Sequence, residues 1–426
     1  MRVLWITHDV IETFYPFVKG KPSKGASWSE PLFSSLVNCD GLEMGIITPV
    51  IEGKYEKIII ENISMYSLPI KKGDNKILLK KELIKEYLKA INDFKPDIIH
   101  VHGTENNFGL LRNHLHYKIP IVCSIQGIIT SCIPYITTSV ANINLNKYKS
   151  LKNWLGNGGI ESLLTWWNKS SLIEKEIFKT NTYFFGRTLW DKTQLFGLNP
   201  NALYFQGEEL LRREFYNHSW DINTCERKSI FFSSGANPIK GLHVMLKAVE
   251  ILKLKHPNIK VNVPLASINT KTTLRDYLFG EDYLIYIRKL VRKLGLEKNV
   301  VFLERLSPNQ MALKFKNSHV FVLASYIENS PNSLGEAMKI GTPTVVSAVG
   351  GTFSMVKDEL STLLFPSGDH FYLAYQLDLL FLNDDLANKL SLNAKKIAEK
   401  RHNVQLVTNQ YYENYKNIIK INNQDI

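Results

Sequence analysis

The sequence lacks the patterns by which several classes of protein are recognised. No apolar run reaches the 18 residues of a membrane span, and the apolar part of MRVLWITHDV is too short for a secretory signal. The four cysteines have neither C-x-x-C spacing nor a nearby histidine pair, which argues against a zinc or disulfide-exchange site. We therefore expect a cytoplasmic chain with reduced thiols and no bound cofactor.

The net charge of the chain indicates which classes of partner it is expected to bind. Lysine and arginine number 52 against 40 acidic residues, so the formal net charge is +12, which favours an anionic surface or substrate. No basic tail, zinc finger or aromatic RNA-binding signature accompanies this charge. Nucleic acid is therefore not expected as a partner.

Strand and helix patterns run through the chain twice. Residues 2–7 (RVLWIT) form an apolar strand, and after a polar stretch at 217–227 the segment 229–234 (SIFFSS) starts a second series. A length of 426 residues allows two or three domains. We predict an α/β protein with one Rossmann-like domain at 1–216, a linker at 217–227 and a second such domain at 228–402.

Residues 325–351 (SYIENSPNSLGEAMKIGTPTVVSAVGG) are the most informative stretch. They follow an apolar strand at 320–324, and cap and breaker residues predict a helix from Ser333 to Gly341. In such a unit, loop amides and the positive end of the helix converge beyond the sheet, where an anionic ligand binds best.

Two carboxylates frame that point. Glu328 lies in the loop and Glu336 in the first helical turn, with seven residues between them. Carboxylates accept hydrogen bonds from sugar hydroxyls. However, Ser333 and Glu336 also have capping-box spacing, so Glu336 has an alternative as a cap partner and Glu328 as a solvated loop acid.

A lysine that precedes residues 325–351 is placed to bind a phosphate group. Lys240 follows the strand at 229–234 and a loop with glycine and proline, and it precedes the predicted helix 243–256. This position allows it to neutralise phosphate charge. The alternative is an ordinary surface lysine.

The segment ENSPNSLGE, followed by AMKIGTPTVVSAVGG, resembles the E-x7-E segment of glycosyltransferase family 4. These are retaining enzymes of the GT-B fold that use nucleotide-sugar donors. The resemblance implies two facing Rossmann-like domains with an interdomain cleft, and a C-terminal helix at 403–426 that packs back on the N-terminal domain.

The resemblance also implies roles for single residues on the donor side. Glu328 would meet the transferred sugar and Glu336 the nucleotide ribose. The amides of Asn329 and Ser330 would lie near the sugar and diphosphate, and Lys240 would bind the diphosphate.

Some positions depart from the family pattern. Gly25 matches the second glycine of a cleft-lining pair, whereas Lys24 stands in place of the first. Gly235 stands where the family usually has an arginine, so Ser233 or Ser234 would help to bind phosphate.

On the acceptor or sugar side, two residues follow predicted strands. The segment 96–103 (PDIIHVHG) resembles a family segment that faces the interdomain cleft. There His102 would contact the acceptor; the alternative is that His102 is a core residue. Gln126 stands where many members have a histidine. A glutamine cannot carry a proton near pH 7.

The resemblance thus implies a retaining, hexosyl-type glycosyltransferase that transfers a sugar from a nucleotide-diphosphate donor to a glycan or lipid-linked acceptor, as in bacterial surface polysaccharide synthesis. The absence of a D-x-D motif agrees with a metal-independent enzyme. An inactive sugar-nucleotide-binding scaffold and a GT-B-shaped epimerase are the alternatives. Three departures from the family pattern favour the scaffold: Gln126, Gly235 and Glu304, the last of which stands where glycine is common.

Two further segments carry predictions. Residues 77–94 form an amphipathic basic helix with Lys80, Lys81, Lys85 and Lys89, which either packs on the sheet with a solvated face or rests on anionic lipid as a peripheral contact. Residues 130–169 lack clear periodicity, and we expect a long irregular insert in the acceptor region.

Overall fold

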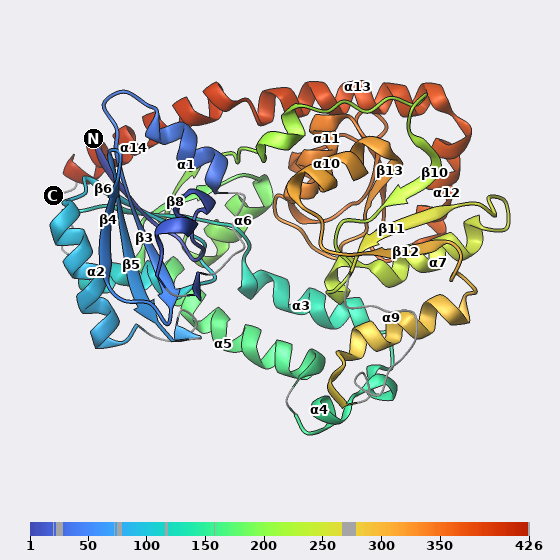
Figure 1. Ribbon diagram of the computed structural model, residues 1–426, viewed down its shortest axis with the longest axis horizontal. Coiled ribbons are helices and arrows are strands. Elements are labelled where there is room, and N and C mark those ends of the chain that lie inside the picture. Colours follow the sequence, from blue (N-terminus) through green and yellow to red (C-terminus); the bar gives the residue numbers. More distant parts are fainter. Residues whose placement is uncertain are drawn as a thin grey trace. The chain divides into compact units, whose positions relative to one another are not determined.

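The protein forms two compact units in a computed structural model that describes residues 1–19, 21–22, 29–71, 73–74, 79–115, 118–156, 158–265 and 278–424. The first unit comprises Met1–Ser131, Trp167–Arg212 and Arg401–Ile426, and the second comprises Cys132–Trp166 and Arg213–Lys400. Each unit is built around its own, mainly parallel sheet (Figure 1), as the α/β prediction requires.

The sheet of the first unit has the strand order β4-β5-β3-β1-β6-β7-β8-β9, with β2 paired to β3. Its strands run parallel except at the β4–β5 and β2–β3 pairs. Their near-continuous apolar sequences are typical of strands covered on both faces. The bounds are β1 (Arg2–Ile6), β2 (Lys21–Pro22), β3 (Glu43–Ile51), β4 (Glu56–Ile60), β5 (Ile63–Ile70), β6 (Ile98–His102), β7 (Ile121–Ser124), β8 (Tyr183–Gly186) and β9 (Leu203–Gln206).

Helices cover both faces of this sheet, because the buried residues form two separate clusters. One cluster includes side chains of α1 and α14, and the other includes side chains of α2, α5 and α6. The bounds are η1 (Glu12–Phe17), α1 (Glu30–Val37), α2 (Lys81–Phe94), η3 (Asn107–His114), α5 (Gly159–Thr180), α6 (Leu189–Leu198) and α14 (Val404–Gln424).

The sheet of the second unit is parallel, with the order β12-β11-β10-β13-β14-β15. Chain order reverses between β10 and β13, and this switch point is where open α/β sheets bind ligands, beyond the carboxyl ends of the strands. The strands are β10 (Glu226–Phe231), β11 (Lys260–Pro264), β12 (Val300–Leu303), β13 (Ser318–Leu323), β14 (Thr344–Ser347) and β15 (Leu363–Phe365).

The helices of the second unit enclose a single large apolar cluster with that sheet. Helix α7 packs on α9 and α12, while α10 packs on α11. The bounds are η5 (Arg213–Tyr216), η6 (Pro238–Lys240), α7 (Leu242–Leu252), α9 (Asp282–Lys293), α10 (Pro308–Asn317), α11 (Asn332–Ile340), η7 (Gly350–Ser354), α12 (His370–Leu382) and α13 (Asp384–Arg401).

The expectation of an irregular insert at 130–169 is wrong. The segment forms α3 (Ile129–Val140), η4 (Leu145–Tyr148), α4 (Leu151–Trp154) and the first half of α5. Most of it belongs to the second unit, although the predicted domain ranges place it with residues 1–216. Its helices are held by contacts with distant residues such as those of α9, and a periodicity search does not detect such contacts.

Helix α14 is tied to the centre of the first sheet by a buried tyrosine. The Tyr415 hydroxyl accepts a hydrogen bond from Trp5 Nε1 (3.1 Å) and lies 2.7 Å from His100 Nδ1. The other ring nitrogen of His100 lies 2.6 Å from Ser124 Oγ. One hydroxyl thus connects α14 to two neighbouring strands.

Removal of this hydroxyl should destabilise the first unit. Tyr415→Phe leaves buried polar groups on Trp5 and His100 without a partner, which typically costs about 1–3 kcal/mol. Tyr412→Phe, at a partly exposed position on the same helix, should change stability by less than about 0.5 kcal/mol. Urea unfolding followed by circular dichroism measures both, and equal midpoints for the two variants would contradict the structural role.

Candidate functional site

Two loops meet at the switch point of the second sheet. One leads from β10 to η6, and the other leads from β13 to α11. Gly241, directly after η6, has φ +74°, and a Cβ there would overlap the carbonyl oxygen of Ala324. The amide of Tyr326 donates to Ile239 O at 2.8 Å. This close approach requires glycine at 241.

The contact between the loops brings Lys240 and Glu328 together. Lys240 Nζ lies 2.6 Å from Glu328 Oε1, and Ser325 Oγ donates to the same oxygen at 2.6 Å. The Lys240 side chain is 32% exposed and that of Glu328 is 10% exposed. A cation and a nearly buried carboxylate therefore lie side by side at the point where the parallel strands end.

The backbone around Glu328 is fixed by later parts of the chain. Its carbonyl oxygen accepts from the amide of Gly351 at 2.9 Å, and Gly350, with φ +47°, passes so close that a Cβ would overlap this oxygen. Ser347 Oγ donates to Ser325 O at 2.7 Å. The end of β14 and the following η7 thus hold the Glu328 loop in place.

The predicted capping box of Ser333 and Glu336 is wrong. Helix α11 begins at Asn332, with Pro331 at the N-cap position, and no described side chain caps it. Ser333 therefore lies inside the helix, where its hydroxyl cannot accept from the first-turn amides as an N-cap would. Glu336 lies in the middle of α11 and is 4% exposed.

The remaining donor-side residues predicted in the second unit lie in the same two loops. Asn329 is buried, and Ser330 Oγ donates to Met355 Sδ at 3.7 Å. Ser233 is partly exposed and Ser234 is exposed. Gly25 lies outside the described residues.

Gly235 is buried and closely packed. A Cβ at this position would lie 2.7 Å from a methyl group of Leu242 and 3.0 Å from one of Val263. The contact with Leu242 is closer than real Cβ atoms show, so a larger residue at 235 would require the end of the Leu242 side chain to shift.

The two predicted sugar-side residues lie at neighbouring strand ends of the first unit. His102 ends β6, and its register partner Ser124 ends β7, two residues before Gln126. The His102 ring centroid lies 3.9 Å from those of Trp5 and His100. Burial lowers the pKa of His102 to about 3, so its imidazole is neutral at pH 7.

The side chain of Arg187 does not pair with Asp191, its near neighbour in sequence. It forms an ion pair with buried Glu209, and its Nη2 donates to Gln126 O at 2.9 Å. Only the backbone amide of Arg187 reaches Asp191. The buried cation thus supports the loop that carries Gln126.

Sequence reasoning missed a contact that supports the Glu328 loop from α7. His243 Nε2 lies 3.1 Å from the Tyr326 hydroxyl, and its Nδ1 lies 3.0 Å from that of Tyr283. Burial lowers the pKa of His243 to about 3, so the ring is neutral. These partners are 40 and 83 residues away in sequence, and no local pattern indicates them.

A second missed residue, Glu174, holds the chain just beyond Gln126. Its carboxylate accepts from the amides of Ile129 (3.0 Å) and Thr130 (2.7 Å) at the start of α3 and from Thr104 Oγ1 (3.2 Å). The side chain is fully buried. Burial, with a smaller contribution from the charge of nearby Glu105, raises the pKa of Glu174 to about 7, although the hydrogen bonds from Thr130 and Ile129 oppose the shift.

Glu174 should make stability depend on pH. Because its folded-state pKa exceeds its unfolded value, the folded state keeps a proton that the unfolded state has released, and stability falls as the pH rises from about 4.5 to 7. The slope is at most about 1.4 kcal/mol per pH unit. Glu174→Gln should remove this decline, whereas Glu176→Gln, at a partly exposed position, should keep it. Urea titrations across this range that find the same slope in both variants would contradict the assignment.

The approach of the two loops can be tested at Gly241. Gly241→Ala adds a left-handed backbone penalty of about 1–2 kcal/mol and a clash with Ala324 O. Gly73→Ala has a similar positive φ but open space around the Cβ, so it should cost only the backbone penalty. Denaturant unfolding should therefore rank Gly241→Ala as the less stable, and the reverse order would exclude a tight loop contact.

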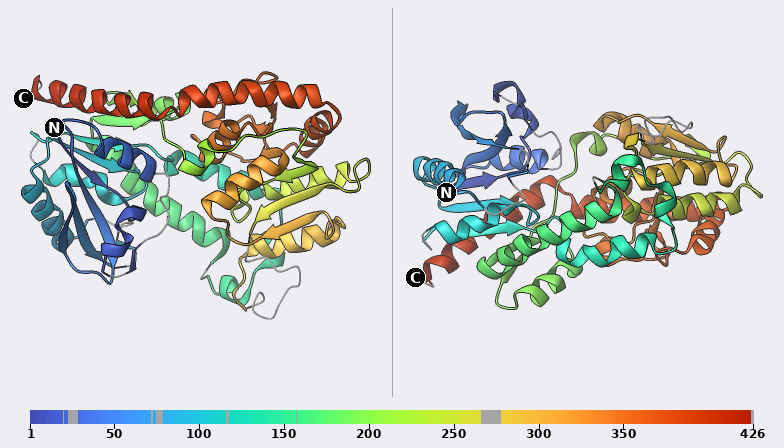
Figure 2. Two further views of the ribbon diagram at one scale, coloured as in Figure 1. Left: turned by 45° about the horizontal axis from the view of Figure 1, so that its top comes forward. Right: turned by 90° about the horizontal axis from the view of Figure 1, so that it is seen from below.

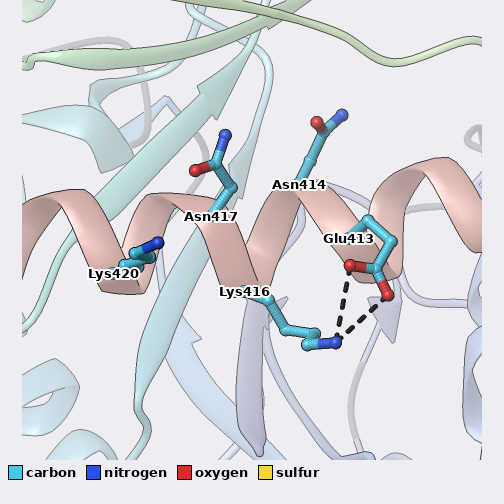
Figure 3. A pocket seen from close by; sticks show the side chains of 5 residues that line it. All are labelled: Glu413, Asn414, Lys416, Asn417 and Lys420. Carbon is cyan, nitrogen blue, oxygen red and sulfur yellow. Dashed lines mark hydrogen bonds and ion pairs between the residues drawn. The ribbon is translucent and has the colours of Figure 1, made fainter.

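The surface also has hollows away from the Lys240 and Glu328 pair. One lies on α14 and is lined by Glu413, Asn414, Lys416, Asn417 and Lys420, with Lys416 Nζ 3.2 Å from Glu413 Oε1 (Figure 3). None of the predicted site residues that the structure describes lines it.

Over the described ranges, no cluster of three or more His, Cys, Asp or Glu residues could hold a metal ion. No helix of the same ranges is long and apolar enough to cross a bilayer.

Comparison with known proteins gives matches in sequence and in fold. Residues 217–397 match the family described as Glycosyl transferases group 1. A putative glycosyltransferase of Bacillus subtilis, YtcC, is 25% identical over 193 residues, which are 44% of each chain. The matched part therefore spans less than half of this curated relative.

Solved structures match nearly the whole chain. The sucrose-phosphate synthase of Thermosynechococcus elongatus has a TM-score of 0.71 at 14% identity, with 99% of this chain and 100% of that chain covered. Anabaena HepE in complex with UDP has a TM-score of 0.65 at 14% identity, with 98% and 100% covered. At these identities the likeness shows the fold alone, which is an α/β fold with two sheets that matches GT-B structures.

Proposed function

Because residues 217–397 match the group 1 glycosyl transferases, we propose that this chain is a retaining glycosyltransferase. It would transfer a sugar from a nucleotide-diphosphate donor to a glycan or lipid-linked acceptor. The observation that carries the proposal is the 2.6 Å contact between Lys240 Nζ and Glu328 Oε1 at the switch point of the second sheet. This pair offers a cation for the diphosphate and an acceptor for sugar hydroxyls within one site.

In the proposed reaction, Lys240 and the first-turn amides of α11 stabilise the charge that develops on the departing diphosphate. Glu328 orients the donor sugar by accepting hydrogen bonds from its hydroxyls. Glu336 binds the ribose, and the amides of Asn329 and Ser330 lie beside the sugar and diphosphate. The positive charge at the leaving group thus comes from the protein, as expected for a metal-independent enzyme.

Further donor contacts are assigned to Ser233, Ser234 and Gly25, and the acceptor or sugar side is assigned to His102 and Gln126. A neutral His102 can donate or accept a hydrogen bond but carries no charge. Gln126 is likewise limited to hydrogen bonding. We therefore assign both to positioning rather than to proton transfer.

We also propose that the enzyme acts on surface polysaccharide at the cytoplasmic face of a membrane. The exposed Lys81 and Lys85 of α2 would contact anionic lipid. The apolar side of this helix, including Leu83 and Tyr87, is buried against the sheet. Contact through α2 would thus be electrostatic alone, while Lys80 and Lys89 already meet Asp74 and the Tyr55 ring.

The donor can be identified by thermal shift with UDP-, GDP- and ADP-sugars, since a ligand that binds the folded state raises the apparent melting temperature. UDP-glucose is the first choice, because one solved structure of Anabaena HepE contains it. Glu336→Ala should reduce the shift, because the ribose loses its hydrogen-bond acceptor. A uridine donor that stabilises wild type and Glu336→Ala equally would exclude the assigned ribose contact.

Transfer should depend on the central pair. With the stabilising donor, Glu328→Ala and Lys240→Ala should lower kcat for transfer or for slow donor hydrolysis by about 10²–10³-fold, because a preorganised electrostatic contact is lost. Glu297→Ala and Lys298→Ala change the same residue types at exposed positions and should keep wild-type rates. Circular dichroism checks the fold, since loss of one partner leaves the other unpaired.

Product analysis separates the alternatives. Donor binding without turnover on any acceptor would favour the scaffold. Interconversion of the donor sugar without an acceptor would favour the epimerase. Inversion of the anomeric configuration in the product would refute the retaining mechanism.

A further inference from the structure

The second unit presents an apolar tip on α4. Leu151, Trp154 and Leu155, which we call the α4 tip, are 51%, 74% and 61% exposed. Helix α4 lies beside α9 at the outer edge of the second unit (Figures 1 and 2). A helix of four residues cannot hold its own shape in water, so the outward position of these three side chains must be imposed by neighbouring residues.

A buried asparagine holds the inner side of α4. Asn153 Nδ2 donates to Gly280 O at 3.1 Å and to the Asp282 carboxylate at the start of α9. Gly158 and Gly159 pass so close that a Cβ on either would overlap an oxygen of Asn153 or Asp282. The polar side of the segment is thus directed inward, and its apolar side is directed outward.

An aromatic contact fixes the approach to α4. The rings of Tyr148, which ends η4, and Tyr286 on α9 meet edge to face at 5.3 Å, and Lys289 Nζ lies 5.2 Å from the Tyr148 ring centroid. Ser150 caps α4 by accepting from the Asn153 amide at 3.3 Å. Contacts on both sides of Ser150 therefore hold the tip in one orientation.

Charged residues of both signs lie around the α4 tip, with a small excess of lysines. Segment 132–166 carries Lys147, Lys149 and Lys152 against Glu161. The start of α9 adds Glu281 and Asp282, and Lys289 lies on the Tyr148 ring, so four basic residues stand against three acidic ones. Lys149 pairs with Glu161 at 2.9 Å and Lys152 with Glu281 at 3.4 Å. Such partly exposed pairs contribute little, and these ammonium groups can turn to phosphates instead.

We propose that the α4 tip is a docking site for an anionic lipid bilayer. Trp154 would lie at the interface of headgroups and acyl chains, where tryptophan is enriched, with Leu151 and Leu155 beside it. The surrounding lysines would contact lipid phosphates. This site differs from α2, whose apolar residues are used in the core, and it makes no use of the donor site.

A second copy of the chain fits the tip less well. A stable dimer buries roughly 800 Å² or more on each partner, whereas the tip consists of three side chains with lysines around them. A symmetric contact would bring like charges together, because the same patch faces itself in a two-fold interface. A bilayer has neither restriction.

The test uses the full chain and vesicles, without any sugar nucleotide. Wild type should co-sediment with vesicles of phosphatidylglycerol and phosphatidylcholine, and less with phosphatidylcholine alone or at high salt. Trp154→Ser with Leu155→Ser should lower the partition coefficient at least about tenfold, because the buried apolar area is lost. Leu172→Ser, at a 68% exposed leucine of α5, is the matched control and should bind like wild type.

Two further measurements decide the assignment. Brominated lipids should quench the tryptophan fluorescence of the wild-type protein more than that of the Trp154→Phe variant. Only the wild-type protein has an indole in the tip that can lie among the acyl chains. Lys81→Gln with Lys85→Gln separates α2 from the tip. Unchanged binding by the Trp154 and Leu155 double variant would overturn the proposal. Light scattering that finds wild type dimeric and this variant monomeric would also overturn it.

Discussion

The site depends on the close approach of two loops beyond the ends of β10 and β13. Gly241 packs against the carbonyl of Ala324, and the amide of Tyr326 bonds to the carbonyl of Ile239. Only with this contact can Lys240 reach Glu328, because their side chains come from loops on either side of the switch point. The parallel sheet determines where the loops begin, and the glycine determines how closely they approach.

Much of this could be predicted from local patterns. The apolar strands, the breakers at the end of α11 and the spacing of Glu328 and Glu336 are contained in short stretches, so both sheets and the position of the acidic pair follow from them. The bounds of β12 at Val300–Leu303 agree residue for residue with the apolar run VVFL. Such strands are continuous apolar segments, so they can be recognised from the sequence alone.

The features that could not be predicted arise from contacts between distant residues. Glu174 caps α3 from 44 and 45 residues away, and the partner of Arg187 is Glu209 instead of the nearby Asp191. The short helix η4 of 130–169 likewise packs on the distant helix α9. The cap of α11 shows the opposite error, because Ser333 has the right spacing to Glu336 but lies two positions past the N-cap residue Pro331.

The unequal exposure of Lys240 and Glu328 bears on how they would share a ligand. Glu328 is 10% exposed and keeps the Ser325 hydroxyl on the same oxygen that meets Lys240. Lys240 is 32% exposed on a flexible stem. An arriving diphosphate would therefore draw the lysine toward itself, while the carboxylate stays held by Ser325 and by the backbone contact to Gly351. The anion released from its ion pair would then be available to sugar hydroxyls, so one movement would prepare both halves of the donor site.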